Sequence, residues 1–471
     1  MSTIFTIFWA SGDLARLKIY PALFTLAVRK KLPTDFSIVG FARSQLTDSA
    51  FFEIFANSVR THVKDWWERE EKILLTLESH ISYITAQYDD AEWYQDYKHL
   101  IERISSQNPQ PPIHQPPSPP VQVLYLAVPP WVVAPILTQF TETFEKWSRD
   151  IRVILEKPFG HDEASARALL RDLQDHYSDE ELYFLDHYMG KKSMRSLLAL
   201  RSKNRIIDTM INPSEIDRIE ISALEDFTIR DRVGYFDSVG ITRDMIQSHL
   251  FEMLALLTLD LPSSLDPASI ARARQHLLDS LIFDHEKDHV SIGQYASYRS
   301  DHKITRDSET ETFIALSLHI DQSKWRDVPI YLRSGKSLEK KETYIVITFL
   351  PAPHAGKDEE PNRIIISLYP EEEISMRFLD ESGDRRETHE IITRESIAGD
   401  RDTYLGSHEL LFLDAIEHER RFFLAPEEIL ASWRCVDRIF ACIRSRNITP
   451  EIYPNNSRGP SWQYDVLKEW Y

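Results

Sequence analysis

The chain has 471 residues, of which only 13 are glycine, while 42% are hydrophobic and 11% aromatic. This composition provides a substantial apolar core and excludes collagen-like, disordered and disulfide-rich chains. The formal net charge of −19 disfavours broad binding to nucleic acid or to an anionic membrane, although a local basic pocket for a small phosphorylated ligand is compatible with it. The length favours two or three domains.

The two cysteines, Cys435 and Cys442, fall in one late helical pattern. Two such residues make a poor disulfide framework and a poor metal site, so we expect a reducing compartment and no metal. No apolar run reaches the roughly 20 residues of a membrane helix. The N-terminus has no basic region before its short apolar stretch, so we expect no signal peptide and a cytoplasmic protein.

Strand and helix patterns alternate through the first third of the chain. The expected strands are residues 4–9, 38–41, 80–86, 121–128 and 151–155, and the expected helices are residues 14–29, 48–77, 92–104 and a segment ending at 147. Repeated βα units predict a mostly parallel, doubly wound, Rossmann-like sheet. Seven prolines crowd residues 109–120 and predict an extended surface loop, with a recognition motif for partner domains as the alternative.

The second half has a different pattern. Residues 216–224, 312–320, 344–350, 363–368 and 373–378 resemble strands, and residues 239–259, 268–281, 403–417 and 427–444 resemble helices. Runs of strands covered by helices predict an α+β domain with a large antiparallel sheet. The junction falls near residues 182–191, and we place the two domains at residues 1–185 and 186–471.

The first strand runs into a helix through the turn FWASGDLA, residues 8–15. Such a turn usually holds a dinucleotide pyrophosphate, because backbone N–H groups and the helix dipole point at the anion. Trp9 stands where the first glycine is expected and only Gly12 remains, so a plain strand–turn–helix is the alternative. Arg43, after the second strand, suits the 2′-phosphate of NADP, and a solvated surface arginine is the alternative.

Further short segments occur along the chain in a characteristic order. They are SGDLA (11–15), KIYPAL (18–23), YLAVPP (125–130), EKPFG (156–160), DHYMGK (186–191), RVGYFD (232–237), DMIQSHL (244–250) and YLRSGK (331–336). Together they resemble the glucose-6-phosphate dehydrogenase family. The resemblance extends from residue 4 to about residue 345, and the final quarter adds no segment of comparable specificity.

The resemblance implies oxidation of glucose 6-phosphate at C1 to a lactone with hydride transfer to NADP, the entry step of the pentose phosphate pathway. It implies that His249 is the general base and that Asp186 orients it. The implied phosphate ligands are His187, Tyr188 and Lys191, and the implied contacts to the rest of the sugar are Lys157, Glu225, Asp237, Lys336 and Lys341. The implied cofactor-side residues are Ser11, Gly12, Asp13, Leu14, Arg43, Pro129 and Lys157. A homodimer or homotetramer built through the antiparallel sheet is also implied.

The residue types agree with this chemistry. A neutral histidine is a suitable base for a hydroxyl proton, and a carboxylate behind it completes the base-plus-orienter arrangement. Each residue taken alone also has a structural alternative. His249 fits a core histidine, Asp237 a helix-capping region, Lys336 and Lys341 a solvated loop, and Gly234 and Gly240 ordinary turns.

The chain departs from the family at several positions. Trp9 replaces glycine, Phe184 replaces arginine, Lys192 replaces an acid, and Ser202 with Lys203 replaces a pair of phenylalanine and a small residue. The indole of Trp9 is large enough to fill the space of the pyrophosphate. Three hypotheses follow: an active NADP-dependent glucose-6-phosphate dehydrogenase, a paralogue oxidising another sugar such as free glucose, and a catalytically impaired sugar-phosphate-binding protein.

Overall fold

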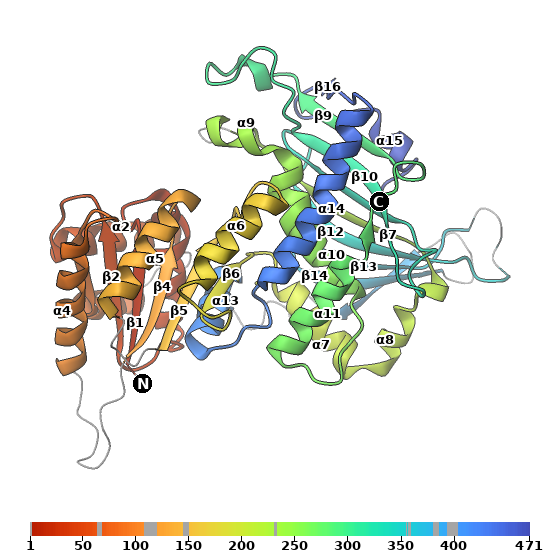
Figure 1. The fold of residues 1–471 in the computed structure, drawn as a ribbon. Helices are drawn as coiled ribbons and strands as arrows, with labels where there is room; N and C mark the ends of the chain where they lie inside the picture. Colours follow the sequence, from red (N-terminus) through yellow and green to blue (C-terminus); the bar gives the residue numbers. More distant parts are fainter. Residues whose placement is uncertain are drawn as a thin grey trace. The chain divides into compact units, whose positions relative to one another are not determined.

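The computed structural model describes residues 2–63, 68–107, 120–144, 150–229, 233–354, 356, 359–379, 386–392 and 404–471. The proline-rich segment lies almost entirely outside these ranges, so its loop conformation stays a prediction. The chain forms two compact units (Figure 1). The first comprises Met1–Gly160, Ala164–Gly190 and Asp402–Pro426, and the second comprises His161–Glu163, Lys191–Arg401 and Glu427–Tyr471.

The first unit is built on a six-stranded sheet in which every pair of neighbours is parallel. Its strands are β1 (Thr3–Phe8), β2 (Phe36–Ala42), β3 (Ile81–Thr85), β4 (Val121–Leu126), β5 (Asp150–Glu156) and β6 (Leu182–Leu185). The order β3-β2-β1-β4-β5-β6 confirms the expected doubly wound, Rossmann-like fold. The short strand β6 did not stand out in the sequence.

Helices complete the first unit (Figure 1). They are α1 (Tyr20–Val28), preceded by the π-helical turn η1 (Ala15–Ile19), and α2 (Asp48–His62), α3 (Glu68–Leu77), α4 (Ala91–Gln107), α5 (Pro130–Phe144), α6 (Glu163–Gln174) and α13 (Ser407–Glu417). The pattern expected as one helix over residues 48–77 is therefore two, α2 and α3. Helix α13 returns to this unit from late in the chain, and Phe412 packs against the rings of Phe5 and Tyr125.

The second unit contains a ten-stranded sheet in the order β15-β14-β13-β12-β7-β11-β10-β9-β16, with β8 paired to β10. The strands are β7 (Ile216–Leu224), β8 (Leu281–Ile282), β9 (Val290–Tyr295), β10 (Phe313–Ile320), β11 (Ile330–Gly335), β12 (Glu342–Phe349), β13 (Arg363–Tyr369), β14 (Glu373–Leu379), β15 (Arg386–Ile392) and β16 (Glu451–Tyr453). The expected antiparallel sheet is confirmed for most pairs, whereas β7–β11 and β9–β16 are parallel.

The helices of the second unit are α7 (Lys192–Lys203), α8 (Arg205–Met210), α9 (Val233–Ile241), α10 (Phe251–Thr258), α11 (Pro267–Asp279), α14 (Pro426–Ser445) and α15 (Gln463–Val466). Figure 1 shows α10, α11 and α14 beside one another. The helix expected over residues 239–259 is interrupted, because Gly240 has a φ of 73° and the chain continues as the π-helical segment η5 (Thr242–Leu250) into α10. Segment η5 packs against β7 and β11.

Candidate active site

The residues predicted for the site are divided between the two units. In the first, the strand register brings four loops to one edge of the sheet. Phe8 lies beside Phe41 and Leu126, and Leu126 lies beside Leu155. The loops after β1, β2, β4 and β5 therefore start at the same level, at the point where the strand order reverses. That position in a doubly wound sheet suits a dinucleotide.

The turn after β1 keeps the backbone path of a glycine although its first residue is tryptophan. Trp9 has a φ of 63°, its N–H donates to the carbonyl of Phe41 (2.8 Å), and its own carbonyl accepts from the N–H of Gly12 (2.9 Å). A Cβ atom added to Gly12 would lie 3.1 Å from Cδ1 and 3.3 Å from Nε1 of the indole. The Trp9 ring therefore lies directly against the face of Gly12 that a glycine normally leaves open.

Ser11, Gly12, Asp13 and Leu14 follow in the same turn, and none of them is buried. The Ser44 hydroxyl donates to that of Ser11 (3.1 Å), which joins this turn to the loop after β2. Arg43 in that loop is exposed. Burial raises the pKa of Tyr88 to about 12, while Arg43 and the backbone of Trp9 oppose the rise. The backbone, Gly12 and Arg43 thus fit a dinucleotide phosphate site, and the indole of Trp9 lies in its path.

The EKPFG segment begins where β5 ends. The buried hydroxyl of Tyr125 donates to the carboxylate of Glu156, and Lys157 beside it is half-buried. The ring of Phe159 packs edge-on against Phe184 with 5.0 Å between centroids, and Phe184 is fully buried. Phe184, where the resemblance led us to expect an arginine, is therefore a core residue in this chain. Pro129, after β4, is half-buried at the same edge of the sheet.

Asp186 and its neighbours form a tight turn after β6. Asp186 is 1% exposed, and its Oδ1 accepts from the N–H of Tyr188 (2.8 Å). The imidazole of His187 lies 4.8 Å from the Tyr188 ring and is nearly parallel to the imidazole of His408, 6.1 Å away on α13. Gly190 ends the turn under α13, since an added Cβ would lie 2.5 Å from the carbonyl oxygen of Ser407. His408 was not predicted, because no sequence pattern links it to residue 187.

The general base predicted for the second unit lies in η5. His249 is 1% exposed, in a segment whose residues Met245–Leu250 are all buried. Near it in the sequence, Gln247 donates to the hydroxyl of Ser432 on α14 (2.8 Å). The π-helical winding is an uncommon feature that is often found at functional sites. His249 is therefore a well-fixed imidazole on a segment that contacts the centre of the large sheet.

Lys336, Glu225 and Asp244 form an ionic cluster around η5. The Lys336 ammonium pairs with Glu225 and lies 3.4 Å from the Asp244 carboxylate. Burial alone lowers the pKa of Lys336, but Asp244 and Glu225 outweigh it, so the pKa lies above the usual value for lysine. Asp244 was not predicted as a site residue, although it begins the DMIQSHL segment. Lys336 is thus a buried group that stays charged rather than a solvated loop lysine.

Two other residues predicted to contact the sugar, Asp237 and Lys341, interact with other side chains of the protein. Oδ1 of Asp237 accepts from the hydroxyls of Tyr298 (2.8 Å) and Ser308 (2.6 Å). The Lys341 ammonium lies 4.3 Å from the centre of the Tyr369 ring. The structure therefore brings Glu225 and Lys336 into direct contact, while Asp237 is held in a separate hydrogen-bonded group.

Lys191 precedes helix α7 and lies near Glu372. Its ammonium is 3.7 Å from Oε1 of Glu372, whose Oε2 accepts from the N–H (2.8 Å) and hydroxyl (3.0 Å) of Ser193. Burial lowers the pKa of Lys192, and Glu372 opposes that shift. Glu372 thus provides a carboxylate beside both Lys191 and Lys192. Sequence analysis did not find Glu372, because it lies in a run of acidic residues with no distinguishing pattern.

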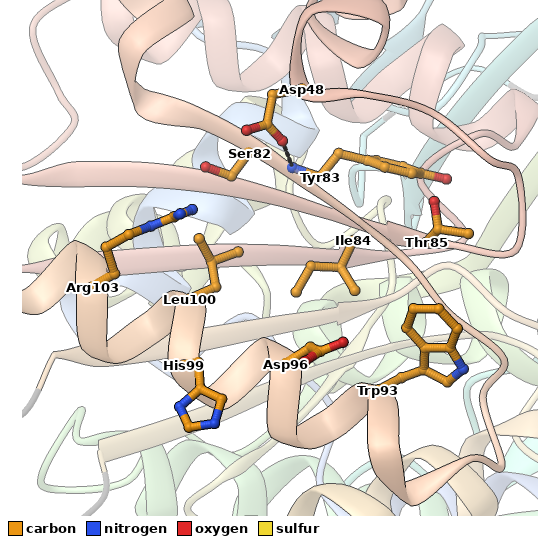
Figure 2. A pocket seen from close by; sticks show the side chains of 10 residues that line it. All are labelled: Asp48, Ser82, Tyr83, Ile84, Thr85, Trp93, Asp96, His99, Leu100 and Arg103. Atoms are coloured by element: carbon orange, nitrogen blue, oxygen red, sulfur yellow. Dashed lines mark hydrogen bonds between the residues drawn. The ribbon is translucent and has the colours of Figure 1, made fainter.

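A cavity of about 430 Å³ in the first unit lies apart from all these residues (Figure 2). It is bordered by the edge strand β3 and by α4, with Tyr83 and Ile84 on one side and Trp93 and Leu100 on the other. Asp48 closes one end by accepting from the N–H of Tyr83 (2.7 Å). None of the residues predicted for the site lines this cavity.

Two family models match the chain in succession. Residues 6–196 match the NAD binding domain of glucose-6-phosphate dehydrogenase, and residues 198–470 match its C-terminal domain. The fold and these matches define an oxidoreductase with a dinucleotide-binding first domain. In the part of the chain that the structure describes, no helix is long and apolar enough to cross a membrane.

Individual relatives agree with the family models. The chain is 32% identical to glucose-6-phosphate 1-dehydrogenase of Saccharomyces cerevisiae over 99% of its length and 93% of that protein. It is 30% identical to glucose-6-phosphate 1-dehydrogenase 2 of Mycobacterium bovis, with 98% and 93% of the two chains covered. The chain belongs to the glucose-6-phosphate dehydrogenase family.

Solved structures give the same assignment. A glucose-6-phosphate dehydrogenase in complex with its substrate glucose 6-phosphate has a TM-score of 0.90 at 30% identity, covering 99% of this chain and 97% of that one. The glucose-6-phosphate 1-dehydrogenase of Mycobacterium avium has a TM-score of 0.83 at 25% identity, covering 100% and 99%. The resemblance noted in the sequence is therefore confirmed at the level of the family and of the fold.

Proposed function

We propose that this protein oxidises glucose 6-phosphate at C1 to 6-phosphogluconolactone with NADP as the oxidant. The observation that carries the proposal is the match to the family over nearly the whole chain, including a similar structure with glucose 6-phosphate bound. A bound nicotinamide would supply the hydride acceptor for C1. The protein's own residues must then bind the sugar, take the proton of the C1 hydroxyl and hold the reacting atoms in place.

His249 is the proposed base, and Asp186 the carboxylate that orients it and stabilises its protonated form. Supporting this role, His249 is buried and fixed in η5, and a histidine titrates in the range a general base needs. Asp186 is equally buried, with one carboxylate oxygen occupied by the N–H of Tyr188. His187, Tyr188 and Lys191 are proposed to bind the phosphate through charge-assisted hydrogen bonds.

The remaining sugar contacts are proposed to come from Lys157, Glu225, Asp237, Lys336 and Lys341. Lys336 has the clearest support, because two carboxylates keep it charged in a buried position. An ammonium has three N–H donors, so one can be directed to a substrate oxygen while the others remain on Glu225 and Asp244.

NADP rather than NAD is proposed because Arg43 is exposed just after β2, where a 2′-phosphate needs a cation. The other cofactor contacts are proposed to be Ser11, Gly12, Asp13, Leu14, Pro129 and Lys157. We also propose a cytoplasmic homodimer or homotetramer. We likewise propose that the boundary between the two domains lies between residues 185 and 186.

The decisive experiment measures reduction of NADP and NAD by the purified protein with glucose 6-phosphate and with free glucose. We expect glucose 6-phosphate with NADP to give the highest kcat/KM. A higher value with free glucose would replace this proposal by the paralogue hypothesis. The position of the Trp9 indole favours a second candidate, a sugar-phosphate-binding protein without turnover; binding of glucose 6-phosphate without binding of NADP would support it.

A further inference from the structure

In the turn after β1, the backbone suits a dinucleotide, whereas the side chain of the first residue, Trp9, obstructs it. The backbone follows the path of the usual glycine, with a φ of 63° at Trp9 and a hydrogen bond from the N–H of Gly12 to the Trp9 carbonyl (2.9 Å). Such a left-handed conformation is unfavourable for a tryptophan, because its Cβ comes too close to the backbone. The chain nevertheless retains it, so the N–H groups after Trp9 keep the course that a dinucleotide turn needs.

The side chain occupies the approach to that same turn. Cδ1 and Nε1 of the indole lie 3.1 and 3.3 Å from the position that a Cβ of Gly12 would take. The second glycine of a dinucleotide turn lacks a side chain so that the pyrophosphate can come close to the backbone. In this chain the neighbouring indole fills the space that Gly12 leaves open.

Only the side chain must move to reopen the turn. Trp9 is half-buried, whereas Ala10 after it is fully buried and Phe8 before it lies in the core of the sheet. A side chain that borders solvent changes rotamer in nanoseconds, much faster than a backbone rearrangement. An indole that turned away from Gly12 would open the turn without any change of the backbone.

We propose that Trp9 is a gate on the dinucleotide turn, and this rests on the proposed use of NADP. The closed indole competes with the pyrophosphate, so NADP binds only to molecules whose indole has turned away. The observed dissociation constant then equals the intrinsic one divided by the open fraction. Trp9 is thus a specificity-determining residue that weakens the binding of ligands with a 5′-phosphate and leaves the Arg43 end of the site unaffected.

The test compares the full-length protein with Trp9→Gly by isothermal titration calorimetry. Glycine suits the observed φ, so the variant keeps the turn; Trp9→Asn, which also tolerates this conformation, is the second variant. Lys30→Gly is the matched control, because Lys30 is exposed in the same unit and has a φ of 54°. Each protein is titrated with NADP and with adenosine 2′-monophosphate, which has no 5′-phosphate.

We expect Trp9→Gly to lower the dissociation constant of NADP about tenfold, as for an open fraction near one tenth. The dissociation constant of adenosine 2′-monophosphate should change less than about twofold. Lys30→Gly should leave the dissociation constants of both ligands unchanged. The gate proposal would be wrong if Trp9→Gly bound NADP no more tightly than the parent protein does. It would also be wrong if binding of adenosine 2′-monophosphate improved as much as binding of NADP. Either result would leave the cofactor proposal intact. If neither the protein nor its Trp9 variants bind NADP, both proposals are wrong.

Discussion

Lys336 combines deep burial with a retained positive charge. Its side chain is 9% exposed and pairs with Glu225 and Asp244, which come from after β7 and from η5. A lysine held in this way acts as a fixed donor, because its charge does not depend on pH near neutrality.

We therefore expect Lys336→Met to lower kcat/KM for glucose 6-phosphate by at least about 100-fold, which corresponds to roughly 2.7 kcal/mol of transition-state stabilisation. The loss combines a missing donor with two carboxylates left facing the substrate. Lys340→Met is the control, since its ammonium is largely exposed and pairs with Glu342. Steady-state kinetics with both variants test the role, and similar values for both would rule it out.

Glu311 is a buried acid that supports η5. Its carboxylate accepts from the N–H of Thr242 (3.1 Å), and burial raises its pKa above the usual value for glutamate. The native state therefore holds the proton more tightly than the unfolded state does. Ionisation of Glu311 therefore destabilises the native state. This effect is absent when the pH lies below the pKa of Glu311 in the unfolded chain, and it is complete once the pH exceeds the pKa in the native state.

Glu311→Gln keeps an oxygen acceptor for Thr242 and removes the buried charge. We expect this variant to match the parent in free energy of unfolding near pH 4, and to exceed it at pH 8. Glu309→Gln, at an exposed position, should have the same free energy of unfolding as the parent at both pH values. Urea unfolding at the two pH values measures the difference; a gain already present at pH 4 would point to packing instead of charge.

At the scale of elements, the atoms that lie close to a glycine show whether the fold requires glycine at that position. Gly190 lets α13 pass over the turn that carries His187, whereas an added Cβ on Gly234 would meet nothing within 4 Å. We expect Gly190→Ala to lower stability by about 2 kcal/mol through overpacking. Gly234→Ala should stay neutral or gain up to about 1 kcal/mol, since alanine is the better residue in a helix. Thermal unfolding of the two variants tests this, and equal shifts would contradict it.

Helices α11 and α14 are joined by an ion pair with no exposure. The Arg274 guanidinium donates to both carboxylate oxygens of Glu428, at 2.6 and 3.2 Å, and each side chain is 0% exposed. Arg274→Met should cost about 3–5 kcal/mol by leaving a buried carboxylate without its cation. Arg274→Met with Glu428→Leu should recover much of that loss. A double-mutant cycle in urea measures the coupling, and additive effects would show that the pair contributes nothing as a pair.

The sequence predicted elements with strong local periodicity better than it predicted their partners. The βα alternation was enough for the parallel sheet, because each strand is a short apolar run between helices. It missed β11, whose Arg333, Gly335 and neighbouring polar residues break the apolar pattern. The helix predicted over residues 239–259 missed most of α9 and joined its end to η5 and α10 across Gly240. Lys336 was found through the resemblance, but Asp244, Glu372 and His408 depend on contacts between distant segments that no spacing reveals.

At the scale of the whole molecule, the first unit is completed by a segment that follows most of the second unit in the sequence. Besides Phe412, this segment supplies carbonyl acceptors at Ala415 and Ile416 for the buried guanidinium of Arg152. His418 lies 2.7 Å from the Tyr183 hydroxyl. A chain that stops near the junction at residues 182–191 would lose all of these partners at once.

We therefore expect residues 1–190 alone to show no cooperative thermal transition and to bind the dye ANS, because Phe5 and Tyr125 lose their cover and Arg152 its acceptors. Residues 1–190 joined by a Gly/Ser linker to residues 402–426 should unfold cooperatively and bind little dye. The control carries Phe412→Ser in the joined chain, which removes the apolar contact with Phe5 and Tyr125 and should restore dye binding. Calorimetry and ANS fluorescence on the three proteins measure this; a cooperative transition in residues 1–190 alone would show that the parallel sheet is complete without its returning segment.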